Sequence, residues 1–235
     1  MRMPTASRLT TVFTPDRLSR LLAAGLVAFA LATGAAEGDL NVADLKTRST
    51  AGDKTATRQL AEAYYLGKGV EQNFSEAARW YLVLAKQGDA RAQTSIGLMY
   101  ARGYGVEQNA AEARRWWQFA ALQNDPAAQF NLGLLLTQSE PPVRDYAQAV
   151  EWYRKAASRG HLGAQHNLGM MYHEGKGTAR DPVRAYFWVA LAAKQGDDIA
   201  EDSLKAVGTG MSKEQITEAQ QQVEEWMKKA KQVWK

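Results

Sequence analysis

The sequence predicts an all-α fold, a solenoid of stacked helix–turn–helix units with a period of 36 residues. One pattern recurs at this spacing over four units, with few departures and no insertion. It consists of a pair such as Leu-Gly, a Gly-x-Gly turn, an Asn or Asp, and an aromatic pair followed by small residues. The clearest copy contains Ile96-Gly97, Gly103-Tyr104-Gly105-Val106, Asn109, Trp116-Trp117 and Ala120-Ala121. Arrays of this kind bury one continuous core and usually present extended surfaces for binding.

The first 36 residues are typical of an export signal. Four arginines and one aspartate precede an apolar and glycine run over 21–32, and small residues follow at 33–36. A basic start, a short apolar middle and small residues at the end indicate a secretory signal peptide. The apolar run is shorter than the ~20 residues that span a bilayer. We therefore expect cleavage near Ala36 and a periplasmic or secreted protein with no membrane span after cleavage. An uncleaved membrane anchor is the alternative.

Charge and cysteine content exclude several functional classes. Without residues 1–36 the formal net charge falls from +4 to +1, so the remaining chain lacks the basic footprint of a nucleic-acid-binding protein. Cysteine is absent, which excludes disulfides, thiolate metal sites and a cysteine nucleophile. We expect no nucleic-acid partner, and stability that comes from packing alone.

Each unit is predicted to hold two helices. Apolar and small residues fall at i, i+4, i+5 and i+8 in the first and at i, i+3, i+4, i+7 and i+8 in the second, one stripe in each case. Small residues next to Trp suggest a ring that lies over a closely approaching helix. Asn109 with Glu112 resembles a capping box. The expected N-caps are Asp53, Asp89, Asp125 and Asp197 for first helices, and Asn73, Asn109, Asp145 and Asp181 for second helices.

The third unit departs from the turn pattern. It carries Ser139-Glu140-Pro141-Pro142 where its neighbours have Gly-x-Gly, so a positive φ is not easily reached and the loop must follow another path. Two interpretations fit this segment: neutral loop variation, which we favour, or a local contact site.

Additional helices are predicted at both ends of the array. A short helix over 40–49 covers the first full unit, and half a unit over 200–207 follows the last. Ser212 and Gln215 form a capping box for a final helix, which either seals the open end or docks to another protein through Trp234. The predicted organisation is a signal peptide at 1–36, an N-terminal capping helix at 37–53, repeats at 54–89, 90–125, 126–161 and 162–197, and a half repeat with a C-terminal capping helix at 198–235.

Together these motifs resemble Sel-1-like repeats (SLR), relatives of tetratricopeptide repeats, over about residues 42–207. The departures are Ala61 and Asn124 in place of glycine, the Pro-Pro loop, and Val189 in place of tyrosine. The resemblance implies a right-handed superhelix of helix pairs and a role as an adaptor or scaffold. Exported bacterial members are often linked to cell-envelope assembly, signalling or host contact. Disulfide-rich members associated with β-lactam binding are a poor match to a chain without cysteine.

No catalytic constellation is visible in the sequence. The segment from Gly169 to Gly175-Lys176 resembles a phosphate loop, but its spacing is wrong and Gly177 stands where Ser or Thr would bind magnesium. His166 and His173 lie two helical turns apart, about 10.5 Å, which is too far for one metal ion. We therefore expect no enzyme activity, no cofactor and no metal. An envelope hydrolase or a glycan- or peptidoglycan-binding protein on the same scaffold is the alternative.

A ladder on the first helices is the candidate partner-binding site. The resemblance implies that first helices line the concave face, where polar and apolar side chains would form two parallel rows. Amide side chains suit an extended peptide backbone, and methionines adapt to varied apolar side chains. The alternative is that the polar residues are merely solvated and the methionines pack between repeats. The ladder contains Gln59, Ser95, Met99, Asn131, Leu135, Asn167 and Met171. The predicted function is a non-enzymatic, envelope-located adaptor for a protein or peptide, of unspecified oligomeric state.

Overall fold

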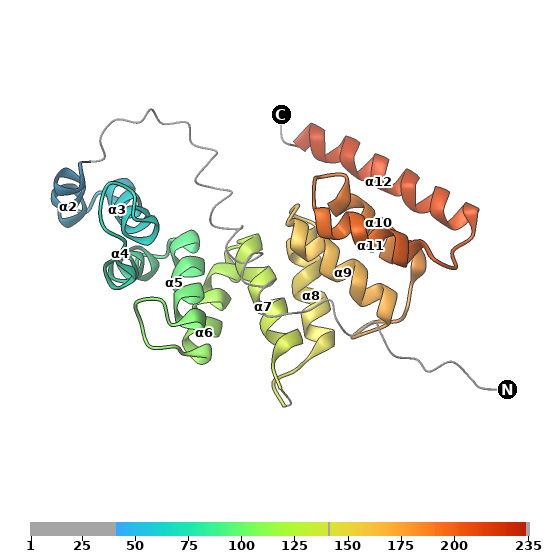
Figure 1. Ribbon diagram of the computed structural model, residues 1–235, viewed down its shortest axis with the longest axis horizontal. Helices are drawn as coiled ribbons and strands as arrows, with labels where there is room; N and C mark the ends of the chain where they lie inside the picture. The colour runs from blue at the N-terminus through green and yellow to red at the C-terminus, as the bar shows by residue number, and fades with distance from the viewer. Residues whose placement is uncertain (1–40, 141, 234–235) are drawn as a thin grey trace. The chain divides into compact units, whose positions relative to one another are not determined.

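The computed structural model describes residues 41–140 and 142–233, and this part of the chain forms helices and turns without any strand (Figure 1). The predicted all-α repeat fold is confirmed. The expected signal peptide, Pro141 and Trp234 lie outside the described residues.

Each of the four units contains two helices. The first helices are α3 (Lys54–Leu66), α5 (Ala90–Arg102), α7 (Pro126–Gln138) and α9 (Leu162–Glu174). The second helices are α4 (Phe74–Lys86), α6 (Ala110–Leu122), α8 (Tyr146–Ala157) and α10 (Pro182–Ala193).

Each first helix packs against the second helix of its own unit, and each second helix packs against the first helix of the next unit. At the ends, α2 (Val42–Thr50) packs on α3, while α11 (Asp198–Gly208) and α12 (Lys213–Val233) pack on α10. In α12 the side chains of Ala219 and Val223 are fully buried. The Ser212–Gln215 capping box is formed in both directions, with N–H to side-chain oxygen distances of 2.9 and 3.2 Å. None of the described helices is long and apolar enough to cross a membrane.

Helix caps follow the sequence prediction in all eight expected places, because each Asp or Asn accepts a hydrogen bond from the first helical turn. One detail of the prediction is wrong. Asn109 and Glu112 do not form a reciprocal capping box, because the Asn109 N–H donates to the Tyr100 carbonyl at 2.8 Å and Glu112 pairs with Arg115 at 3.3 Å. The cap of the second helix is thus tied to the end of the first, which fixes the turn between them.

Close approach of helices depends on glycine beneath the aromatic rings. A Cβ added at Gly97 would lie 2.6 Å from Cδ1 and Nε1 of Trp117. The same relation recurs one unit later, where a Cβ at Gly133 would lie 2.5 Å from the Tyr153 ring. These contacts confirm the expected ring over a closely approaching helix.

A series of buried glutamines, which the sequence analysis does not predict, forms hydrogen bonds between consecutive helices. The Nε2 atoms of Gln93, Gln129 and Gln165 donate to the carbonyls of Ala85, Ala121 and Ala157 at 3.0, 3.2 and 3.2 Å. Gln123 and Gln195 in turn donate to the Oε1 atoms of Gln93 and Gln165 at 2.8 and 2.9 Å. Arg159 occupies the equivalent position in the third unit, and there the buried Oε1 of Gln129 has no partner among the described residues.

The third unit ends its first helix differently but keeps its register. The helix α5 ends in a left-handed residue, Gly103, with φ of 70°, whereas α7 ends at Ser139 with φ of −69°. The expected change of loop path is confirmed. Asp145 still donates its N–H to the Leu136 carbonyl at 3.1 Å, as Asn109 does to Tyr100. The loop therefore takes a new path without displacing α8.

Candidate functional site

The structure places several residues of the predicted ladder inside the fold. Met99 has no exposed surface and belongs to the hydrophobic core around α3, α4 and α5. Its predicted contact with a partner is wrong, because the apolar side chain is used for packing between repeats. Ser95, Asn131 and Met171 are also buried, whereas Leu135 and Asn167 are partly exposed and Gln59 is exposed. Partner binding at these other positions stays a prediction.

Two polar members of the predicted ladder act on buried tyrosine hydroxyls of the preceding repeat. Burial raises the pKa of Tyr153 to about 12 and that of Tyr81 further. Against this effect, Ser95 lowers the pKa of Tyr81, and Asn167 lowers that of Tyr153, whose hydroxyl also lies 3.2 Å from Thr137 Oγ1. Ser95 and Asn167 therefore lie close enough to buried phenols to affect their ionisation.

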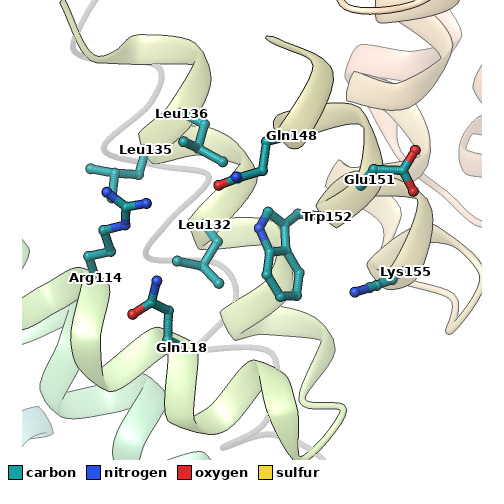
Figure 2. Close-up of a pocket in the computed structure, with 9 residues that line it drawn as sticks. All are labelled: Arg114, Gln118, Leu132, Leu135, Leu136, Gln148, Glu151, Trp152 and Lys155. Atoms are coloured by element: carbon teal, nitrogen blue, oxygen red, sulfur yellow. The ribbon is translucent and has the colours of Figure 1, made fainter. Parts of the chain in front are cut away.

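A recess between successive second helices is the best-formed candidate site. It has a volume of about 310 Å³ and lies among α6, α7 and α8. Figure 2 shows the Trp152 indole turned toward Leu132, with Arg114 and Gln118 across the recess. Leu135 is the one residue of the predicted ladder that lines it. The complete lining is Arg114, Gln118, Leu132, Leu135, Leu136, Gln148, Glu151, Trp152 and Lys155.

A second recess, of about 360 Å³, lies one unit earlier between α4 and the turn of the second unit. There α4 contributes Ala78 and Leu82, which stand 36 residues before Arg114 and Gln118, and Val106 from the following turn lines the same recess. The adjacent Trp116 is only 8% exposed, whereas its counterpart Trp152 is partly exposed. The tryptophan side chain is therefore more exposed in the recess at α6, α7 and α8 than at the equivalent position of the preceding unit.

The rim of the recess carries an excess of positive charge. Glu151 pairs with Arg154 at 2.6 Å, so its carboxylate is already neutralised. The Lys155 ammonium lies 4.3 Å from the centre of the Trp152 ring, a cation–π contact. Among the described residues, Arg114 forms no ion pair. Two cations thus flank an apolar floor.

One serine–histidine pair was missed by sequence reasoning, because 37 residues separate its members. His166 Nε2 lies 3.0 Å from Ser203 Oγ. The Ser203 hydroxyl donates to the Ile199 carbonyl at 2.9 Å, so the histidine nitrogen acts as the donor in this pair. A general base must instead accept the proton of the nucleophile. Burial lowers the pKa of His166 and favours its neutral form. The contact joins α9 to α11 and has no catalytic orientation.

Comparison with known proteins identifies the repeats. The sequence matches the Sel1 repeat at residues 55–89, 90–125, 126–161 and 163–197. The chain belongs to the Sel1 repeat family. Sel1 repeat proteins generally mediate protein–protein interactions. A search of curated proteins gave no match to this Sel1 repeat chain.

Two solved Sel1 repeat structures share its fold. One is c5321, a protective antigen present in uropathogenic Escherichia coli strains and displaying an SLR fold, with 31% identity over 90% of this chain and a TM-score of 0.76. The other is a Sel1 repeat protein from Oxalobacter formigenes, with 32% identity over 71% of this chain and a TM-score of 0.63. The chain spans 44% and 48% of the lengths of these two proteins.

Proposed function

We propose that this Sel1 repeat chain is a non-enzymatic adaptor or scaffold of the bacterial cell envelope that binds a protein or peptide. The observation that carries the proposal is the recess at α6, α7 and α8, which combines a partly exposed tryptophan, three leucines and two cations, Arg114 and Lys155, that form no ion pair with the described residues. Exposed aromatic and arginine side chains around an apolar centre are typical of protein-binding surfaces. The basic and apolar composition of residues 1–32 supports export.

The alternative, an envelope hydrolase or glycan-binding protein on the same scaffold, would need reactive groups in a suitable arrangement. Among the described residues, the His166–Ser203 pair is the contact that most resembles such a site, and the Ser203 hydroxyl donates to the Ile199 carbonyl and not to the histidine. Within residues 41–140 and 142–233, no cluster of three or more His, Asp or Glu side chains could hold a metal ion. Binding is therefore the function that this geometry supports best.

Affinity capture tests the adaptor function directly. The full chain with a C-terminal tag is expressed in a bacterial host and recovered from envelope extracts after mild cross-linking. We expect a stoichiometric protein partner that is lost when the untagged chain is added in excess. Residues 1–40 fused to alkaline phosphatase should give an exported, active reporter, and an inactive reporter would refute the envelope location.

An activity assay tests the alternative. The chain is incubated with a chromogenic β-lactam, with peptidoglycan and with p-nitrophenyl acetate, alongside Ser203→Ala. We expect no turnover by either protein. Turnover by the natural chain that disappears in Ser203→Ala would replace the adaptor proposal with a hydrolase.

A further inference from the structure

We propose that the recess among α6, α7 and α8 is a docking site for an acidic peptide segment that inserts one bulky apolar side chain beside Trp152. This inference rests on the proposed protein-binding function and assigns it a place and a ligand chemistry. For brevity we call the recess, with the lining residues given above, the α6–α8 groove.

The α6–α8 groove is open because the described part of the third unit's turn, residues 139, 140 and 142, does not pack onto α6. In the second unit the turn packs onto the preceding second helix, and Gly105 lies directly against the backbone of Phe74 at the start of α4. Any Cβ at this position would clash with that backbone. The third unit has Pro141 at the equivalent sequence position, and the same approach to a helix backbone would need a residue without a Cβ there.

Because the turn of the third unit does not pack onto α6, the counterpart of Val106 does not cover the α6–α8 groove. In the second unit Val106 is partly buried, packs against the core cluster that includes Ala78, and lines one recess with Ala78 and Leu82. Its counterpart Pro142 is exposed, as is the neighbouring Val143 at 44%. Within residues 41–140 and 142–233, the apolar surface around Trp152 is consequently left without a cover, although burying it would be favourable.

Size and shape suit a side chain of a peptide. A volume of about 310 Å³ is at the lower end of the range for ligand sites, enough for one bulky side chain and its neighbours. Apolar surface continues along α6 beyond the groove, because Leu122 stands one helical turn after Gln118 and is 76% exposed. An occupant longer than a single residue would therefore gain further contacts.

Charge complementarity selects an acidic occupant. Arg114 offers a planar guanidinium, whose donors match a carboxylate in a bidentate arrangement. Lys155 adds a second positive charge over the Trp152 ring. An anionic membrane is the weaker candidate, because the apolar floor lies below charged rim residues that would meet a flat surface first.

Fluorescence anisotropy of labelled peptides tests the docking site in the full chain. The probe is a fluorescein-labelled pool of octapeptides with Asp and Glu flanks and two central positions drawn from Leu, Ile, Phe, Met and Trp. Two control pools keep either the apolar centre with Lys flanks or the acidic flanks with a Ser/Asn centre. We expect saturable binding of the first pool alone, weakened by raised salt.

Variants locate the binding. Arg114→Ala and Trp152→Ala should each weaken it about tenfold, equivalent to the loss of one well-packed contact. Arg115→Ala is the matched control, because this neighbouring arginine does not line the groove and pairs with Glu112 instead. Replacing residues 139–142 with Gly-Tyr-Gly-Val restores the turn of the second unit, and this graft should abolish binding without lowering the melting temperature.

Three other outcomes would contradict the assignment of the α6–α8 groove as a peptide-docking site. Absence of binding by the acidic apolar pool, or binding that survives both the graft and Arg114→Ala, would overturn the groove assignment. Groove-dependent binding to phosphatidylglycerol vesicles without peptide binding would replace the peptide with a membrane. If a protein partner is still captured from envelope extracts in these cases, the adaptor function stands and the groove inference alone fails.

Discussion

The N-cap of α9 is a histidine, and its ionisation should make the stability of the array depend on pH. His161 Nδ1 accepts a hydrogen bond from the Ala164 N–H at 3.2 Å, and its ring stacks on Phe130 with centroids 4.4 Å apart. Burial lowers the pKa of His161 to about 4, from an ordinary 6.5, and outweighs the attraction of the Asp197 carboxylate. A positive charge would also oppose the dipole at the start of a helix.

The magnitude follows from this depressed pKa. Because the folded chain binds the proton less tightly than the unfolded chain, the contribution to stability is complete above about pH 6.5 and is lost as pH falls toward 4. A shift of this size corresponds to about 3 kcal/mol when the loss is complete, and to about 2 kcal/mol between pH 7.5 and pH 5.

Urea unfolding followed by circular dichroism at 222 nm measures the effect. The natural chain is compared with His161→Asn, which keeps a capping side chain but does not titrate. We expect the natural chain to lose about 2 kcal/mol more than the variant between pH 7.5 and pH 5. Equal losses in the two proteins would show that the ring is not held in its neutral form.

Three further substitutions probe the stacking of repeats in the same unfolding assay at pH 7.5. Gly97→Ala places a methyl group against Trp117 and should destabilise by about 1–3 kcal/mol, despite the better helix propensity of alanine; an unchanged or raised stability would disprove the close contact. Trp116→Ala should cost about 3–5 kcal/mol, and a loss below about 1 kcal/mol would refute the packing of this ring. Arg159→Gln should stabilise by about 1 kcal/mol by donating to the unpaired Gln129 Oε1; a chain that is no more stable would show that this oxygen is satisfied in another way.

The fold was predictable because local signals and repetition agreed. The cap residues, the apolar stripes and the glycines beneath aromatic rings each act within one unit or between neighbouring units, so a fixed spacing in the sequence reveals them. The Ser212–Gln215 box is similarly local. Asn109 and Glu112 misled us, because the same residue types also form a cap without the reciprocal bond when a nearby carbonyl, here that of Tyr100, accepts the N–H.

The candidate site was less predictable, because exposure depends on what covers each side chain. The helical position of Met99 is compatible with either the concave face of the array or the core. The sequence pattern alone does not decide between these two locations. The opening at Trp152 depends on whether a turn from the same unit can dock on α6. A signal is present in the sequence, since the Pro-Pro segment of the third unit replaces the Gly-x-Gly-Val turn that brings Val106 into one recess with Leu82. Neutral variation of that segment is the interpretation that the sequence alone favours.

Site-specific photo-cross-linking in the cell envelope is the most direct test that this array works by binding a protein. A photoreactive residue is introduced at Gln118 inside the α6–α8 groove, at Gln59 in the predicted ladder, and at Gln222 on the exposed face of α12 as a control. We expect a discrete cross-linked protein from position 118 and none from position 222. If positions 118 and 59 both give no protein adduct under conditions where the chain is folded and exported, the array does not act as a protein-binding scaffold through either surface.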